Sequence, residues 1–138
     1  MTDGSPVHEK RIEIRWSDLD VYGHVNNAIY LTYLEEVRDE WLGGTLGGPD
    51  EIWNWVLARV EIDYRRELAL ADDVAVASCR LDRVGNSSLT TREEVRTADG
   101  ELAAEAKAVL VARDRESGRS RPLTAAERAA FAPDSGEG

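Results

Sequence analysis

The chain has 138 residues, of which 42% are hydrophobic and 32% are charged, and its formal net charge at pH 7 is -10. A chain of this size fits one domain that builds its core without disulfides or a structural metal. The negative charge argues against a nucleic-acid partner, because such binding depends on Lys and Arg side chains that neutralise phosphates. It also disfavours an acidic carrier protein, because two acidic surfaces repel each other on approach.

The sequence carries no signal for a membrane or for secretion. Residues 1–10 are polar and lack the apolar core of a secretory signal, and no apolar run approaches the roughly 18 residues of a membrane span. We therefore expect a cytoplasmic protein that does not bind membranes. Cys79, His8 and His24 form no ligand set of plausible spacing for zinc, so we expect no metal and no cofactor.

The first predicted elements are a strand and a long helix. Residues 11–16 alternate, with the apolar side chains on one face, which is typical of a half-buried strand. Apolar residues then recur at helical spacing between Tyr30 and Trp41. Asn26 or Asn27 can cap the start of this helix, and Gly43 follows its end. We expect residues 43–50 to form a flexible connector.

Four further strands are predicted, over residues 56–64, 74–84, 88–97 and 102–114. In the first of them, alternate residues from Val56 to Tyr64 share the apolar face. The last three are separated by the turn signals Gly85-Asn86 and Asp99-Gly100. A short helix is predicted over 125–131. This order indicates an α+β fold in which an antiparallel sheet surrounds one helix. We divide the chain into a flexible amino terminus (1–9), one domain (10–131) and a disordered tail (132–138).

Two carboxylates, Asp18 and Asp20, lie between the first strand and the helix. The first turn of a helix has unpaired N–H groups and a partial positive charge, which can hold the oxyanion formed when a carbonyl is attacked. A carboxylate beside it can activate water or attack the carbonyl itself. From the pattern alone, however, turn and capping roles explain these residues better than a catalytic role does.

The stretch W-S-D-L-D-V-Y-G-H-V-N-N-A-I-Y at residues 16–30, followed by E-E-V-R at 35–38, resembles the signature of the 4-hydroxybenzoyl-CoA thioesterase branch of the hotdog superfamily. It is similar in particular to acyl-CoA thioesterases with a G-H-V-N-N core. V-G-N-S-S at 84–88 and V-L-V-A-R-D at 109–114 are also similar to that family. The resemblance therefore covers residues 10–123.

This resemblance implies a hotdog fold, in which a five-stranded antiparallel sheet wraps around a long central helix. It implies hydrolysis of an acyl-CoA to the free acid and coenzyme A, by a homodimer or homotetramer with active sites at subunit interfaces. The second Asp of the family's D-x-D-x-x-G motif is its catalytic carboxylate, and that position is Asp20. Asn27 matches the position whose backbone N–H polarises the thioester carbonyl. The resemblance leaves open whether Asp20 acts as nucleophile or as general base.

Other residues have two readings each. His24 is a catalytic candidate that orients the loop or contacts the substrate, or it has a structural role. Tyr30 shapes a substrate pocket or fills the core. We interpret Asp18 as a brace of the turn, and Glu35 with Arg38 as an ion pair on the helix. The last candidates are Gly85, Ser87 and Ser88. They line a substrate channel across the dimer, or they form an ordinary hairpin turn.

Two alternative functions remain at this point. The first is a hotdog enoyl-CoA hydratase or dehydratase, but His24 follows Asp20 by four positions without an intervening proline, which departs from the motif of those enzymes. The second is a non-catalytic acyl-CoA-binding module, because a fold alone does not establish function. The sequence does not identify the acyl group or the arginines that contact coenzyme A.

Overall fold

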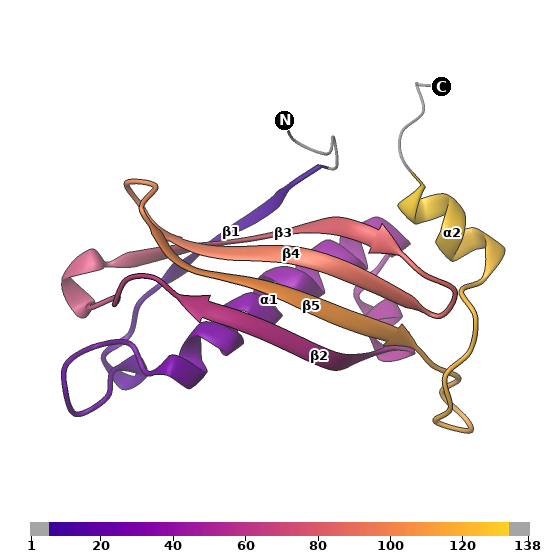
Figure 1. Cartoon of the computed structure of the whole chain (residues 1–138), viewed down its shortest axis with the longest axis horizontal. Coiled ribbons are helices and arrows are strands. Elements are labelled where there is room, and N and C mark those ends of the chain that lie inside the picture. Colours follow the sequence, from indigo (N-terminus) through magenta and orange to yellow (C-terminus); the bar gives the residue numbers. More distant parts are fainter. Residues whose placement is uncertain (1–5, 133–138) are drawn as a thin grey trace.

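The computed structural model describes residues 6–132, which form one antiparallel sheet and two α-helices (Figure 1). The strand order is β1-β3-β4-β5-β2. The long helix α1 packs against one face of this sheet, so the predicted α+β hotdog arrangement is confirmed. No helix in residues 6–132 is long and apolar enough to cross a membrane. The elements are β1 (His8–Glu13), α1 (Asn27–Leu46), β2 (Trp55–Tyr64), β3 (Val74–Val84), β4 (Ser88–Thr97), β5 (Leu102–Ala112) and α2 (Ala125–Phe131).

The bounds of β3, β4 and α2 are those predicted, whereas β1, β2 and β5 differ from the prediction; β5 ends at Ala112 instead of residue 114. β1 begins at His8, inside the segment predicted to be flexible, and ends before Trp16, which lies in a 3-10 turn and is 79% exposed. In β2 the register shifts between Leu57 and Arg59. This bulge resets the alternation, so that Leu57 shares the inner face with Tyr64 and Val56 does not. Residues 1–5 and 133–138, which include most of the predicted tail, lie outside the described residues.

α1 starts where predicted but continues past the glycines that were expected to end it. Asn26 is the N-cap, and its side chain accepts a hydrogen bond from the Ala28 N–H at 2.9 Å. The helix ends at Leu46, where Gly47 adopts a left-handed φ of 99° and the Gly48 N–H donates to the Gly43 carbonyl at 2.8 Å. A Cβ on Gly43 would lie 3.2 Å from the Gly48 carbonyl oxygen, so this glycine permits the close return of the chain. Residues Pro49–Asn54 form a 3-10 helix instead of a connector without structure.

The middle of α1 contains a buried ion pair. The Arg38 guanidinium donates two hydrogen bonds of 2.8 Å to the carboxylate of Glu93 on β4, which also accepts a 2.6 Å bond from the Thr91 hydroxyl. The interpretation that Arg38 pairs with Glu35 is therefore wrong, because Arg38 is on the face of α1 that packs on the sheet. Cys79, on the neighbouring strand β3, is fully buried, as expected for a core residue.

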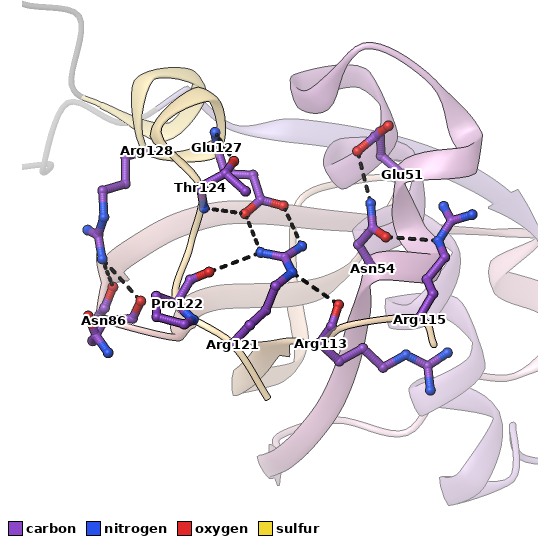
Figure 2. A network of polar contacts seen from close by, with 11 residues as sticks. Glu51, Asn54, Asn86, Arg113, Arg115, Arg121, Pro122, Thr124, Glu127 and Arg128 are labelled. Atoms are coloured by element: carbon purple, nitrogen blue, oxygen red, sulfur yellow. Dashed lines mark hydrogen bonds and ion pairs between the residues drawn. The ribbon is translucent and has the colours of Figure 1, made fainter. Parts of the chain in front are cut away.

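α2 is attached to the end of the sheet where the β3–β4 hairpin lies (Figure 2). Arg121 donates two hydrogen bonds, of 2.8 and 3.0 Å, to the Glu127 carboxylate, and Thr124 caps the helix by accepting from the Glu127 N–H. Arg128 donates to the backbone carbonyls of Gly85 and Asn86 at 3.2 and 3.1 Å. These bonds hold α2 against the hairpin.

Candidate active site

An open cleft of about 740 Å³ lies at the amino-terminal end of α1. Three parts of the chain form it: the loop between β1 and α1, the first turn of α1, and the end of β2 with the residues that follow it. In Figure 1 these parts meet at the end of the sheet opposite α2. Its lining residues are Asp20, Tyr22, His24, Val25, Asn27, Tyr30, Tyr64, Arg65, Arg66 and Glu67.

Asp20 is a half-buried residue of this cleft, and one of its two carboxylate oxygens is fixed. Its Oδ1 accepts hydrogen bonds from the backbone N–H groups of Tyr22 and His24, at 2.9 and 3.3 Å. The Asp20 N–H donates to the His24 carbonyl at 2.8 Å, and Gly23 has a φ of 82°, which closes the turn. Oδ2 accepts no hydrogen bond from the described residues. The turn therefore orients the carboxylate and leaves one oxygen available.

Asp18, two residues earlier, differs from Asp20 in its burial and in the hydrogen bonds that its carboxylate accepts. It is 1% exposed, and its Oδ2 accepts from the Arg15 N–H at 3.0 Å and from the Tyr33 hydroxyl at 2.7 Å. Its Oδ1 accepts from the Arg15 guanidinium at 3.1 Å. Burial raises the pKa of the Asp18 carboxyl, but the bonds from Arg15 and Tyr33 outweigh it, so that the pKa lies below its usual value. Asp18 therefore braces the turn, as interpreted from the sequence.

The first turn of α1 offers one unpaired N–H group to the cleft. The Asn26 side chain accepts from the Ala28 N–H, and the Asn26 carbonyl accepts from the Ile29 N–H at 2.8 Å. The Asn27 N–H has no acceptor among the described residues, although Asn27 lines the cleft together with Asp20. An unpaired N–H at the positive end of a helix can stabilise a developing oxyanion.

Tyr30 and Tyr64 form one wall of the cleft. Their rings are perpendicular to each other, with centroids 5.2 Å apart. The Tyr64 hydroxyl donates to the Asn27 carbonyl at 2.9 Å. The Tyr30 hydroxyl donates to the Arg66 carbonyl at 3.3 Å and accepts from the Leu68 N–H at 3.0 Å, so Tyr30 both lines the cleft and is buried in the core.

The sequence analysis did not select the cleft residues that come from the end of β2, namely Tyr64, Arg65, Arg66 and Glu67. For Tyr64 a signal was present, because it is the last residue on the apolar face of the predicted strand. For the charged residues the pattern contains none, since Arg66 and Arg65 also form ordinary surface ion pairs, with Asp72 at 3.2 Å and Glu105 at 2.8 Å.

His24 lies at the edge of the cleft and is half-exposed. Its Nδ1 is 3.3 Å from a carboxylate oxygen of Glu67. The contact that orients the ring is thus with Glu67, whereas the link between His24 and Asp20 runs through the backbone. The structure therefore does not form an Asp20–His24 side-chain pair of the kind that a hydratase uses.

The predicted substrate-binding residues of the β3–β4 hairpin lie at the other end of the sheet, far from the cleft of their own chain (Figure 1). The Gly85 N–H donates to the Ser88 carbonyl at 2.7 Å, and the Ala112 N–H donates to the Ser87 carbonyl at 2.9 Å. Within one chain these residues form a hairpin turn. Their contact with a substrate across a dimer stays a prediction.

The family model described as "Thioesterase-like superfamily" matches residues 14–133. The chain belongs to this superfamily. The match includes the whole cleft, the loop of Asp20 and all of α1. Membership places the chain among the thioester hydrolases.

Relatives in the superfamily agree with this assignment. The chain is 32% identical to the "Long-chain acyl-CoA thioesterase FadM" of Escherichia coli (strain K12) over 114 residues, which cover 77% of this chain and 83% of FadM. It is also similar to the crystal structure of a thioesterase from Thermus thermophilus in complex with coenzyme A and Zn. That structure has a TM-score of 0.83 and 36% identity, and the match covers 94% of this chain and 99% of that one. A 1,4-dihydroxy-2-naphthoyl-CoA thioesterase from Synechocystis, at 17% identity and a TM-score of 0.79, shows the same fold over 91% of this chain and 96% of that one.

Proposed function

We propose that this protein hydrolyses acyl-CoA thioesters to the free acid and coenzyme A, with Asp20 as the reactive carboxylate and the Asn27 N–H as the oxyanion donor. The observation that carries the proposal is that two groups without a hydrogen-bond partner among the described residues belong to residues of one cleft. These groups are Asp20 Oδ2 and the Asn27 N–H. The acyl-CoA substrate is supported by the name of the FadM relative and by the coenzyme A in the Thermus structure. The cytoplasmic location stays a prediction.

Two routes to the products are compatible with this geometry. As nucleophile, Asp20 attacks the carbonyl carbon, the C–S bond breaks, coenzyme A leaves as the thiolate, and water hydrolyses the resulting mixed anhydride. As general base, Asp20 accepts a proton from water, whose oxygen attacks the same carbon before the C–S bond breaks. In both routes the carbonyl oxygen becomes negative and the Asn27 N–H stabilises it.

The test is the substitution Asp20→Asn, which preserves the size of the side chain and its Oδ1 acceptor but removes the charge. We expect kcat with an acyl-CoA to fall by on the order of 10³-fold, because neither route is open to an amide. The thermal midpoint should stay close to that of the wild type, since Asn retains the bonds within the turn. Thiol release is measured with a panel of acyl-CoAs. The matched control is Asp99→Asn, whose side chain is exposed in the turn between β4 and β5 and lies outside the cleft.

A single turnover in ¹⁸O-labelled water, combined with a rapid quench, separates the two routes. Label in the Asp20 carboxylate identifies a nucleophilic Asp20 whose anhydride is opened by water at the Asp20 carbonyl. Label in the released acid alone fits a general base or an anhydride opened at the acyl carbonyl, and mass spectrometry of the quenched protein distinguishes these two by the presence or absence of acylated Asp20. Thiol release by Asp20→Asn at the wild-type rate would rule out both routes and with them the proposal.

We further propose that the active form is a dimer in which the β2 strands of two copies pair antiparallel. β2 is an edge of the sheet, and its exposed apolar residues include Val56 and Leu57, at 41% and 43% exposure. An exposed apolar edge strand is a template for pairing with another chain. Antiparallel pairing would bring the Trp55 end of one copy beside the Tyr64 end of the other.

This dimer would complete the site in two ways. The β3–β4 hairpin lies at the Trp55 end of the sheet, so Ser87 and Ser88 of one copy would approach the cleft of the other. The same end carries Arg113 and Arg115, whose side chains bond the Trp53 carbonyl and Asn54, both neutral acceptors. Their positive charge would offset the net negative charge of the protein where a polyanionic substrate enters.

Sedimentation equilibrium tests the dimer. Leu57→Arg places a charge on the proposed interface and should lower the mass toward that of one chain, with a parallel loss of hydrolysis. Val7→Arg changes an apolar residue of similar exposure, at 51%, next to the opposite edge strand β1 and should preserve both the mass and the hydrolysis. A wild-type protein with the mass of one chain contradicts the proposal.

A further inference from the structure

We propose that Tyr64 is a positioning residue for the oxyanion donor, because its hydroxyl fixes the first residue of α1 relative to Asp20. The inference rests on the proposed function and concerns the same cleft. It assigns a role to a residue that neither the sequence motif nor the turn of Asp20 contains.

The contact joins two elements that are distant in the sequence. Tyr64 is the last residue of β2, and Asn27, 37 positions earlier, is the first residue of α1. The Tyr64 hydroxyl donates to the Asn27 carbonyl at 2.9 Å. Because β2 is anchored to β5 through Tyr64 and Ala104, the bond ties the start of the helix to the sheet.

This bond acts on the residue that carries the donor. The N–H and the carbonyl of Asn27 flank one Cα, so a restraint on the carbonyl also restrains the direction of the N–H. On the other side, the Asn26 carbonyl, which shares a peptide group with the Asn27 N–H, accepts from the Ile29 N–H at 2.8 Å. The peptide groups before and after Asn27 are therefore both held, one by the first turn of α1 and one by Tyr64. Direction matters because a hydrogen bond weakens steeply as its angle departs from linear.

The surroundings of Tyr64 are suited to this role. Tyr30 packs edge-on against its ring, and the Tyr30 hydroxyl is itself bonded to the segment after β2. Burial raises the pKa of the Tyr64 hydroxyl, so the group stays protonated and remains a donor at neutral pH. Tyr64 is nevertheless 42% exposed, and it lines the cleft. Filling the core is therefore not its main contribution.

The experiment is Tyr64→Phe, which keeps the ring and removes the hydroxyl. We expect kcat for acyl-CoA hydrolysis to fall about tenfold, less than the roughly 10² to 10³ that follows from deleting an oxyanion donor outright. KM should change by less than about twofold, since the misaligned N–H matters most when the carbonyl oxygen becomes negative.

A spectroscopic readout separates positioning from a merely structural role. A carbonyl-¹³C-labelled acyl-CoA is bound to Asp20→Asn protein, and the C=O stretch is measured by isotope-edited infrared difference spectroscopy. The oxyanion donor should shift the stretch to lower frequency, and Tyr64→Phe in the same background should move it back toward the value of the free thioester. Tyr33→Phe is the matched control, because it removes a hydroxyl that bonds the Asp18 carboxylate and lies outside the cleft, and it should leave the frequency unchanged.

An unchanged kcat together with an unchanged carbonyl frequency in Tyr64→Phe overturns the inference, as does a loss of thermal stability alone. Failure of the proposed function looks different, because the wild-type protein would then release no thiol from any acyl-CoA.

Discussion

Polar groups near the start of α1 and in its middle differ in burial and in how many of their hydrogen bonds are made within the protein. In the middle, Arg38 and Glu93 are buried and bonded to each other through two pairs of atoms. At the start of α1, Asp20 in the preceding loop and Asn27 in the first turn line an open cleft, and each keeps one group without a partner among the described residues. Polar groups that use all of their hydrogen bonds within the protein hold the fold, whereas groups with spare capacity are available to a substrate.

The same contrast separates two carboxylates that are two positions apart. Asp18 is enclosed and both of its oxygens accept hydrogen bonds, whereas Asp20 is half-buried and has one oxygen fixed. The difference follows from the backbone: a 3-10 turn directs Asp18 toward the helix, and the turn at Gly23 leaves Asp20 at the edge of the cleft.

The largest expected effect concerns the buried pair of Arg38 and Glu93, whose polar groups are bonded within the protein. Arg38→Met leaves the Glu93 carboxylate buried without its partner, and we expect the free energy of unfolding to fall by about 3–5 kcal/mol. Arg38→Met with Glu93→Met replaces the pair by apolar side chains and should recover at least half of that loss. Both are measured by urea denaturation, with hydrolysis normalised to the folded fraction. A double variant as unstable as the single one would mean that the pairing does not account for the loss.

A smaller effect should separate Asp18 from Asp20. Asp18→Asn should lower the free energy of unfolding at pH 7 by about 2 kcal/mol, because one charge-assisted bond to Arg15 is lost in a buried site. Asp20→Asn should change it by less than about 0.5 kcal/mol, as for a partly exposed side chain. Equal losses for the two variants would remove the distinction between brace and reactive group.

The pH dependence of the free energy of unfolding is a further test of the structural role of Asp18. The pKa of Asp18 is lower in the folded protein than in the unfolded chain, so its contribution to stability is complete above the unfolded value, near 4, and is lost as the pH falls through the folded value. The free energy of unfolding of the wild type should therefore decrease between pH 5 and pH 2 more steeply than that of Asp18→Asn. Urea denaturation at several pH values in this range measures the slope.

Local patterns were sufficient to predict much of the sheet. The strands over Val74–Val84 and Ser88–Thr97 were predicted with their observed bounds, because alternation and turn residues are properties of neighbouring positions. The helix cap was predicted to be Asn26 or Asn27, and the structure has Asn26. Asp20 was different: pattern did not distinguish it from Asp18, and only the resemblance to the thioesterase family did.

The features that sequence reasoning missed depend on contacts between distant positions. Arg38 meets Glu93 across 55 positions, so a partner three residues away on the helix looked more plausible. The continuation of α1 through Gly43 depends on the close return of Gly48, and the bulge in β2 depends on its pairing with β5. Tyr64 shows the same limit, since its position in the strand was predictable but its bond to Asn27 was not.

The burial of Cys79 has a consequence for the chemistry of the product. The proposed reaction releases coenzyme A, a free thiol, beside a protein that has a single cysteine. Burial and the neighbouring Glu93 carboxylate raise the pKa of the Cys79 thiol, so it stays protonated, and it has no solvent exposure. Thiol–disulfide exchange requires a thiolate that its partner can reach. In the folded chain Cys79 is therefore not available to form a mixed disulfide with released coenzyme A.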